Sequence, residues 1–405
     1  MTKFPRVFIT GMGAVSALGL GIGPLWDAVR AGKSGVRDIE MPRTANQLIR
    51  KAAHLDAFDP AAFLATDTVK YSDRFAQMAL IAAGEMLADA GWPTGEPLGN
   101  GTAVLIGSGL GGAGTTDREY HKFYSTRERT DPLTVPKVMS NAAASHVSMA
   151  YGARGPSLAV SSACSSASQA IGLGLMLLRM GAAERAIVGG SECLLVPGVF
   201  RAWEALRVMT PTLCRPFSKG RDGMVLGEGA ALIMLETEAA AQARGARPLA
   251  ELAGFGSTSD AGDIVRPDAE SAARAMQLAL TDAGIAPSGI GYVNAHGTGT
   301  VLNDRSESEA LRLVFGAHLE GLAVSSTKPA HGHALGAAGA LELAITVCAL
   351  RDDIAPPTIN WTGADADCIS APVPNVAQAQ PIAAAMSNSF AFGGINASLI
   401  VRKVS

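Results

Sequence analysis

The sequence of 405 residues predicts an α/β fold built from two similar halves. Short apolar runs, typical of buried strands, alternate along the chain with segments that repeat apolar residues at helical spacing. Helices between successive strands favour a largely parallel sheet with covered faces. The same order of elements starts again near residues 245–248, although no sequence identity between the halves is evident. We therefore expect an N-terminal half over residues 1–246 and a C-terminal half over residues 247–405.

The N-terminal half begins with an apolar run at residues 6–10 that ends in Gly11-Met-Gly13, which predicts a strand followed by a tight turn. Residues 165–180 are almost entirely apolar, which predicts a helix buried on all sides. Residues 115–136 are the most polar stretch, and we expect them to run irregularly over the surface or onto a partner. Other strands are predicted at residues 102–106, 157–161, 185–188 and 230–235, and other helices at residues 72–91 and 238–244.

The C-terminal half repeats this alternation of strands and helices. Residues 334–350 are rich in alanine and leucine and predict a helix, but Glu342 and the short length exclude a membrane span. The other helices are predicted at residues 270–283 and 307–315, and the strands at residues 249–255, 292–295, 323–326, 383–386 and 397–401.

The composition excludes several classes of protein. Only 17% of the residues are charged, the formal net charge is −3, and no lysine or arginine block indicates a nucleic-acid surface. The first residues run directly into a strand and lack the apolar core of a signal peptide. We expect a cytoplasmic protein with no nucleic-acid partner and no membrane contact.

Cys164 differs from the other cysteines in its setting. The five cysteines are odd in number and widely spaced, which argues against a disulfide framework or a zinc site. Cys164 lies among small residues between a predicted strand and a predicted helix, a setting that resembles a nucleophile elbow. The positive end of the helix dipole there favours a thiolate. The alternative is a buried, inert thiol, which is our interpretation of Cys193, Cys214, Cys348 and Cys368.

His296 follows the predicted strand at residues 292–295 and precedes Gly-Thr-Gly-Thr. A polar residue at the carboxyl end of a strand faces the crevice where α/β proteins bind ligands. Thr298 and Thr300 place hydroxyl groups at alternate positions, which suits an amide-bearing substrate arm. The alternative is a histidine that only caps a loop.

His333 precedes the helix at residues 334–350 and follows Lys328 by five residues. Together with His331 and His296 it could bind zinc, but no neighbouring aspartate or glutamate completes the ligand set. Lys328 would also oppose a cation. We therefore expect no catalytic metal, and we expect Lys328 to add positive charge where a carboxylate or an enolate develops.

A glycine-rich segment, Gly107-Ser-Gly-Leu-Gly-Gly112, matches the dinucleotide-binding pattern after a strand. No clear acidic residue follows at the distance needed to hold a ribose, and a lone match is weak support for a nucleotide site. We expect no nucleotide cofactor.

Taken together, these segments closely resemble the elongating β-ketoacyl-acyl carrier protein synthases of the thiolase-like superfamily. The resemblance covers nearly the whole chain. It implies a thiolase-like fold, in which duplicated βαβαβαββ halves form five layers, α-β-α-β-α. Besides the segments around Cys164, His296 and His333, it rests on Ile9-Thr-Gly-Met-Gly13, Pro216-Phe-Ser-Lys-Gly-Arg-Asp222-Gly-Met-Val-Leu-Gly-Glu-Gly229 and Ser387-Asn-Ser-Phe390-Ala-Phe392-Gly-Gly-Ile-Asn396.

The resemblance implies a role for each candidate residue. Cys164 would accept the acyl group, and His296, His333 and Lys328 would complete the catalytic set. The backbone N–H groups of Cys164 and Phe392 would form the oxyanion hole, and Phe392 would also gate the acyl pocket. The residues implied to bind substrate are Thr298, Thr300, Leu110, Phe200, Trp203 and Phe390, and those that match the monovalent-cation region of some relatives are Asn294, Glu342, Ser387 and Asn388.

The implied activity is a decarboxylative Claisen condensation between acyl and malonyl groups that acyl carrier protein delivers on phosphopantetheine. No cofactor of its own is implied. A homodimer is expected, with a heterodimer as the alternative.

Departures from the family pattern, such as Asp263 and the bulky Trp203, favour a specialised synthase in secondary lipid or polyketide synthesis. The alternative functions are a chain-length-factor-like binding subunit of a heterodimeric ketosynthase, and a thiolase or coenzyme A-dependent acyltransferase.

Overall fold

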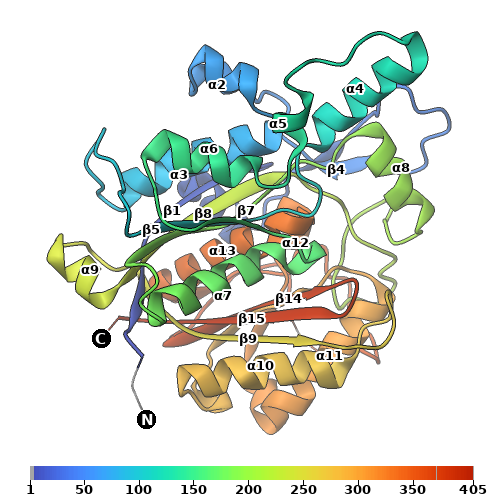
Figure 1. Cartoon of the computed structure of the whole chain (residues 1–405). Helices are drawn as coiled ribbons and strands as arrows, with labels where there is room; N and C mark the ends of the chain where they lie inside the picture. The colour runs from blue at the N-terminus through green and yellow to red at the C-terminus, as the bar shows by residue number, and fades with distance from the viewer. Residues whose placement is uncertain (1–3, 371, 405) are drawn as a thin grey trace.

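A computed structural model describes residues 4–370 and 372–404 of the chain. Its helices and strands form five layers, α-β-α-β-α, which can be followed from top to bottom in Figure 1. Two helices lie in the middle layer, between the two sheets, and other helices cover the outer faces. This layering is the one that the family resemblance implies.

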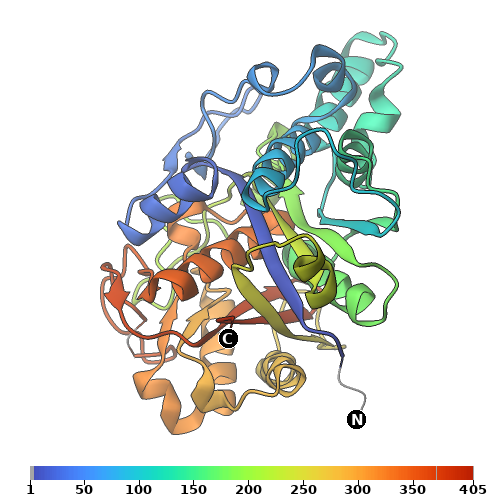
Figure 2. The same cartoon turned by 90° about the vertical axis from the view of Figure 1, so that its left-hand side faces the viewer.

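The two sheet layers are the N-terminal and C-terminal halves of one continuous sheet, and they join at β1. Figure 2 shows β1, in blue, crossing the molecule toward the N-terminus. The N-terminal half contributes β1 (Val7–Ser16), β8 (Gly229–Thr237), β7 (Arg185–Glu192), β5 (Thr102–Gly107) and β6 (Ser157–Val160), in that spatial order. The C-terminal half continues from β1 with β9 (Ala250–Ser259), β15 (Ile395–Arg402), β14 (Ala384–Ala391), β10 (Tyr292–Asn294) and β11 (Ala323–Ser325).

The expectation of a largely parallel sheet is wrong. Only β5 and β10 pair in parallel with both neighbours, whereas the ladders from β7 through β8, β1, β9 and β15 to β14 are antiparallel. Two features of the chain produce the antiparallel pairing. The turn between β14 and β15 is a tight hairpin, and β1 inserts between the last strand of one half and the first strand of the other.

Strand β1 continues through the glycines at which we expected a tight turn. It pairs with β9 only at Phe8 and Ile9, so its later N–H groups need other acceptors. Met12 and Ala14 donate theirs to Asp89 and Glu85 of helix α3 (Arg74–Asp89), at 2.9 and 2.8 Å. The helix can approach this closely because Gly11 and Gly13 carry no side chain.

The helices form three layers. Helices α3 and α6 (Ala142–Tyr151) cover the N-terminal sheet, and α10 (Ala269–Ala283) and α11 (Val301–Phe315) cover the C-terminal sheet. Helices α7 (Ser166–Arg179) and α13 (Ala338–Asp352) lie between the sheets. The remaining elements are β2 (Gly19–Leu20), α1 (Ile22–Arg30), β3 (Val36–Asp38), β4 (Lys51–Ala53), η1 (Pro60–Ala62), α2 (Thr66–Tyr71), α4 (Ala113–Thr126), α5 (Thr134–Val138), η2 (Ala163–Ser165), α8 (Pro197–Ala205), α9 (Glu238–Ala243), η3 (Pro287–Gly289), η4 (Gly316–Gly321), α12 (Lys328–His331), η5 (Leu335–Ala337), β12 (Ile354–Ala355) and β13 (Gln378–Ala379).

Two expectations about helices need correction. Helix α7 is not buried on all sides, because Leu173 and Met176 are exposed next to the edge strand β6. The polar stretch at residues 115–136 is irregular only over residues 127–133, because its first part belongs to α4 and its last residues belong to α5. In both cases composition alone gave no information about the neighbour that the segment meets.

No helix within the described residues is long and apolar enough to cross a bilayer. The cytoplasmic location and the division of the chain at residues 246 and 247 stay predictions.

The contact between β1 and α3 gives a stability test. We expect Gly13→Ala to lower the free energy of unfolding by about 1–3 kcal/mol, because the added methyl group meets the carbonyl of Ala82. Gly23→Ala in α1 is the control: its methyl group meets nothing within 4 Å, and alanine favours a helix over glycine by about 0.5–1 kcal/mol. Urea denaturation of both variants checks this, and equal midpoints would contradict the packing argument.

Candidate active site

Cys164 lies on a strained turn between a strand and a helix, which is the setting that the sequence predicts. Strand β6 ends at Val160, and Cys164 lies in the short η2 segment directly before α7. The preceding residue, Ala163, has a φ angle of 49°, a left-handed conformation that costs energy for any residue with a side chain. The turn directs a largely buried thiol, 5% exposed, toward two histidines from the other half.

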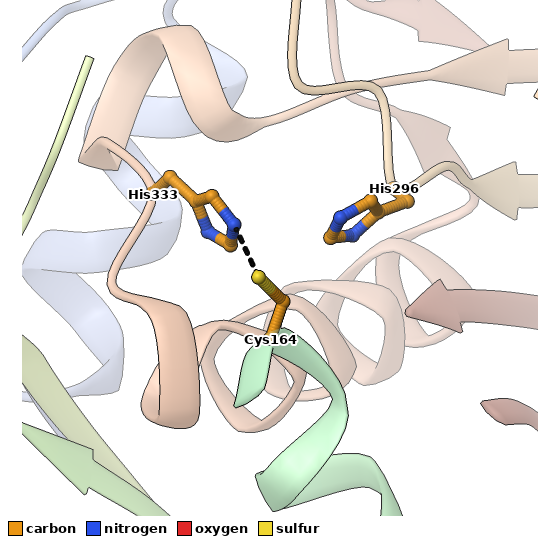
Figure 3. A group of neighbouring side chains, drawn as sticks. All are labelled: Cys164, His296 and His333. Atoms are coloured by element: carbon orange, nitrogen blue, oxygen red, sulfur yellow. Dashed lines mark hydrogen bonds between the residues drawn. The ribbon is translucent and has the colours of Figure 1, made fainter. Parts of the chain in front are cut away.

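The two predicted histidines meet Cys164 (Figure 3). His333 Nε2 lies 3.2 Å from the Cys164 sulfur. The imidazole of His296 faces that of His333 edge-on, with 5.4 Å between ring centroids and 82° between planes. One ligand atom from each of the three side chains lies within 4.8 Å of the others. Residues far apart in the sequence therefore form one compact thiol–imidazole site.

His333 is held by backbone pairing with the N-terminal half. Its N–H donates to Val225 O at 2.8 Å, and Gly227 N–H donates to His333 O at 2.9 Å. Gly332, with a φ angle of 73°, allows the chain to turn directly before this bridge. The segment paired with His333 belongs to the glycine-rich motif at residues 216–229. The motif is therefore part of the site, because its backbone holds His333 in position.

His296 is held by a carboxylate that the sequence did not single out. Glu307 of α11 accepts hydrogen bonds from the backbone N–H groups of His296 and Gly297, at 2.8 and 2.7 Å. Its side chain is fully buried. A charged residue on the buried face of an amphipathic helix is uncommon. The position of Glu307 on that face was therefore the signal by which the sequence could have identified it.

Lys328 fixes the proton position on His296. Its ammonium group donates to Nδ1 of His296 at 3.3 Å, to the backbone oxygen of the same residue, and to Glu342. An imidazole that accepts at Nδ1 carries its proton at Nε2, so the free N–H of His296 is at Nε2. Burial raises the pKa of Glu342 to about 7, and Lys328 opposes that rise.

Burial decides the protonation of the reacting groups. It lowers the pKa of His296 and of His333 well below 6.5, with Lys328 as the second cause, so both imidazoles are neutral at neutral pH. Burial also raises the pKa of the Cys164 thiol to about 12, against the opposing effect of Lys328. The expectation that the helix start favours a resting thiolate is therefore wrong, and a neutral His333 is available to accept the thiol proton.

Two backbone N–H groups point at the sulfur of Cys164. They belong to Phe392 and to Cys164 itself, and both favour negative charge at this position. Phe392 lies in the turn between β14 and β15, followed by Gly393 and Gly394 with φ angles of 82° and 69°. The two donors implied for an oxyanion hole are therefore next to the nucleophile.

A cavity of about 250 Å³ leads to the thiol. Trp203, Thr298, Thr300, Phe390 and Phe392 line it, as do Cys164 and both histidines. The hydroxyl oxygens of Thr298 and Thr300 lie 2.9 Å apart.

The structure does not bring Leu110 and Phe200 into the lining of this cavity. Phe200 has no exposed surface and packs in an apolar cluster that also contains Cys164. Leu110 is 43% exposed, on the loop that follows β5.

The glycine-rich loop after β5 binds a carboxylate of the chain itself. Glu192 accepts hydrogen bonds from the N–H groups of Gly109 and Leu110, from the hydroxyl of Ser108 and from Gly336 N–H. Burial raises the pKa of Glu192 to about 7 against these donors. The loop that resembles a dinucleotide site is thereby tied to the segment that follows His333, a role that the sequence did not reveal.

The residues of the expected cation region fit such a group only in part. Asn294 and Ser387 are neighbours across β10 and β14, and Asn294 Nδ2 donates to the backbone oxygen of Glu342. Glu342 Oε2 and Ser387 Oγ are buried without a hydrogen-bond partner, as atoms that face a cation would be. The side chain of Asn388 is instead engaged by Met276 and Ser398. A monovalent cation held by the other three residues stays a prediction.

His331 is separate from the site. Its Nε2 lies 3.0 Å from the Thr327 hydroxyl, and burial lowers its pKa to about 3. The zinc site of His296, His331 and His333 that the spacing allowed is therefore not formed. Among the described residues, Cys164, His296 and His333 are the one group with metal-ligand spacing, and the Lys328 ammonium next to His296 opposes a divalent cation.

Known proteins are similar to this chain over its whole length. Residues 5–241 match the family model "Beta-ketoacyl synthase, N-terminal domain", and residues 249–362 match "Beta-ketoacyl synthase, C-terminal domain". The chain belongs to the β-ketoacyl synthase family. It is 40% identical to Nodulation protein E of Rhizobium sp. (strain N33) and 40% identical to 3-oxoacyl-[acyl-carrier-protein] synthase 2 of Coxiella burnetii, in each case over 98% of this chain and 99% of the relative.

Solved structures of ketosynthases have the same fold. One is a type II polyketide ketosynthase in complex with its acyl-carrier protein and bound to a hexaketide. It matches with a TM-score of 0.92 and 30% identity, over all of both chains. The fold class and the family predicted from the sequence are confirmed, and the chain is a 3-oxoacyl-[acyl-carrier-protein] synthase-type acyltransferase.

The carboxylate that holds His296 gives a test of the site. We expect Glu307→Gln to slow the β-ketoacyl synthase reaction by about 10- to 100-fold, because one of two buried N–H groups loses its acceptor, at a cost of about 1–3 kcal/mol. Glu309→Gln, at an exposed position of the same helix, is the control and should keep its rate. Steady-state rates of both purified variants check this, and equal rates would show that Glu307 does not position His296.

Proposed function

We propose that this protein condenses an acyl group held on Cys164 with a malonyl thioester and releases CO₂, with both groups delivered by an acyl carrier protein. The observation that carries the proposal is the geometry around the sulfur. A neutral imidazole lies 3.2 Å away, a second imidazole faces it, and two backbone N–H groups point at the sulfur.

The acylation step uses His333 and the two backbone donors. The Cys164 thiol gives its proton to the Nε2 of His333 as the sulfur attacks the thioester carbonyl. The N–H groups of Cys164 and Phe392 stabilise the oxyanion. The bond to the pantetheine sulfur then breaks, and that sulfur takes the proton from His333. One C–S bond thus forms at Cys164 as the C–S bond to the pantetheine breaks.

The condensation step uses both histidines. The malonyl thioester loses CO₂, and the electron pair of the broken C–C bond forms an enolate. The Nε2 proton of His296 is available to that oxygen because Lys328 occupies Nδ1. The enolate carbon attacks the acyl carbonyl, and the bond to Cys164 breaks. The thiolate that leaves takes up a proton from solvent, so the condensation consumes one proton. The product is a β-ketoacyl thioester.

The mouth of the cavity suits a carrier protein that is acidic. Arg207 and Arg266 line the cavity from two different segments and are exposed, and the carboxylates of Asp222 in the same lining and of Asp263 beside Arg266 offset part of their charge. Ile264 and Leu302 add exposed apolar surface there. Basic and apolar groups around one opening are suited to steering and docking an acidic partner. The hydroxyl groups of Thr298 and Thr300 lie farther in, where the pantetheine arm would pass.

The alternative of a chain-length-factor-like binding subunit has less support. Such a subunit needs no nucleophile, whereas Cys164, His296, His333 and Lys328 here form one connected set. The thiolase alternative would need a second cysteine at the site. Among the described residues, Cys164 is the single cysteine in the cavity lining.

Mass spectrometry tests the proposed reaction. The protein incubated with an acyl-carrier protein thioester should gain one acyl group on Cys164, and malonyl-carrier protein should then release a β-ketoacyl product. Cys164→Ala should gain no acyl group, and the control Cys348→Ala should behave as the wild type. We expect His296→Ala to keep the acyl addition but to lose about 100- to 1000-fold in condensation, because it lacks one donor to the enolate.

Acyl-coenzyme A alone serves as the comparison substrate. Acylation by the carrier thioester but not by the coenzyme A thioester supports a carrier-dependent synthase. A wild-type protein that never gains an acyl group would contradict the proposal and would favour the binding-subunit alternative.

We further propose that two copies of the chain pair at strand β6. This strand is the edge of the N-terminal half of the sheet, and its residue Leu158 is 48% exposed. Met149 of α6 and Met176 of α7 are exposed on the two helices that contact β6. An open edge strand with apolar neighbours is rarely left uncovered. A second copy can cover it through two-fold pairing of the same strand.

Light scattering during size-exclusion chromatography tests the dimer. The double variant Leu158→Asp/Met176→Glu should elute as a monomer, because pairing of two copies would bury the introduced carboxylates between them. Leu278→Glu, an exposed leucine on the outer helix α10, is the control and should stay dimeric. A wild-type protein that is monomeric at micromolar concentration would overturn the proposal.

A further inference from the structure

The side chain of Glu192 contacts both halves of the chain close to the reacting groups. It has no exposed surface and lies at the end of β7. One oxygen, Oε2, accepts hydrogen bonds from Gly109 N–H in the N-terminal half and from Gly336 N–H in the C-terminal half. The other oxygen, Oε1, accepts from the Ser108 hydroxyl and from Leu110 N–H, each at 3.2 Å. The carboxylate therefore bridges two segments that are far apart in the sequence.

On its N-terminal side this bridge leads to the turn that carries Cys164. In the loop that the carboxylate holds, Ser108 N–H donates to the backbone oxygen of Val160 at 3.1 Å. Val160 is the last residue of β6, and the turn with Cys164 follows it directly. A methyl group on Gly107 would collide with the backbone of Ala167, so the start of the same loop packs against the start of α7. The loop thus touches the nucleophile turn at both of its ends.

On its C-terminal side the bridge leads to His333. Gly336 lies in η5, the segment that follows His333. A methyl group on Gly336 would collide with the Glu192 carboxylate, so no side chain separates the two. The backbone pairing of His333 with Val225 and Gly227 holds this segment at its other end. The N-terminal half therefore holds the imidazole from two points.

The bridge requires a side chain that only accepts hydrogen bonds. All four donors are uncharged, and each carboxylate oxygen receives two of them. A glutamine can keep its oxygen between Gly109 and Gly336 while its NH₂ group donates to the Ser108 hydroxyl, because a hydroxyl can rotate to accept. A methionine of similar size removes both acceptors. The two substitutions therefore separate the bridge from the volume of the side chain.

We propose that Glu192 is a positioning residue for the contact between the Cys164 thiol and the His333 imidazole. It holds the strand end before the thiol and the segment after the imidazole in one arrangement. Without the bridge, the separation of 3.2 Å between Cys164 Sγ and His333 Nε2 is no longer maintained, and proton transfer from the thiol slows. The effect on acyl transfer rests on the proposed function, whereas the contact itself does not depend on any thioester.

Alkylation of Cys164 by iodoacetamide tests this contact, because it needs the thiol proton to leave but needs no acyl substrate. The rate is followed by mass spectrometry of the peptide that contains Cys164. We expect Glu192→Met to slow alkylation by about 10- to 100-fold, since a misplacement of about 1 Å has an effect of that size. Glu192→Gln keeps the acceptor between the two glycines and should recover most of the rate. Glu184→Met, at an exposed position directly before β7, is the control and should match the wild type.

A double-mutant cycle distinguishes positioning from a general loss of structure. His333→Ala removes the imidazole and should itself slow alkylation. If Glu192 acts through His333, adding Glu192→Met to His333→Ala should slow alkylation no further. A second slowing of similar size, or a wild-type rate in a folded Glu192→Met protein, would overturn the proposal. If Glu192→Met does not fold, Glu192→Asp, whose carboxylate is withdrawn by one methylene group, replaces it in every comparison.

Acylation by acyl-carrier protein gives the matching readout for the reaction. The same variants should slow the first acyl addition to Cys164 in the same order as they slow alkylation, and a different order would count against the proposal. A wild type that is alkylated but gains no acyl group would contradict the proposed function instead. The alkylation rates would then still decide the role of Glu192.

Discussion

The starts of α7 and α13 lie in contact between the two sheets, and the positions of the reacting groups depend on that contact. A methyl group on Gly339 would collide with Ser168, and one on Gly190 would collide with the backbone of Gly336. Close packing of this kind leaves the two backbones little room to move relative to each other. Cys164 lies just before α7, and His333 lies just before the η5 segment that leads into α13. The separation of these two residues is therefore set by helix packing rather than by the histidine side chain alone.

Burial gives this site its electrostatic character. The dry surroundings keep His296 and His333 neutral and keep the proton on the thiol. Lys328 and Glu342, buried next to His296, compensate each other's charge. Such a pair is expensive to bury unless its geometry is good. Here it determines which nitrogen of His296 carries the proton, so the ion pair contributes orientation to the reaction.

Local sequence patterns predicted much of the fold and the nucleophile. They failed where a residue's role depends on contact with a segment far away in the sequence. Alternating apolar runs located most strands and helices, and the turn before α7 distinguished Cys164 from four other cysteines. The prediction ended strand β1 too early. Gly11 and Gly13 allow helix α3 to pack closely against the strand, and no local pattern shows that contact. Glu307 and Glu192 were missed because their partners are backbone N–H groups of other segments. Phe200 was expected in the cavity but lies in the apolar cluster that also contains Cys164.

The shared cavity has a consequence for kinetics. Two thioesters that reach one sulfur by one route cannot be bound there together, so the proposed reaction follows a ping-pong order. The first carrier must dissociate before the second can bind. Malonyl-carrier protein in excess then competes with acyl-carrier protein for the free enzyme and inhibits its own condensation. The balance of the two carriers, as well as the chemistry at Cys164, would set the rate of chain growth.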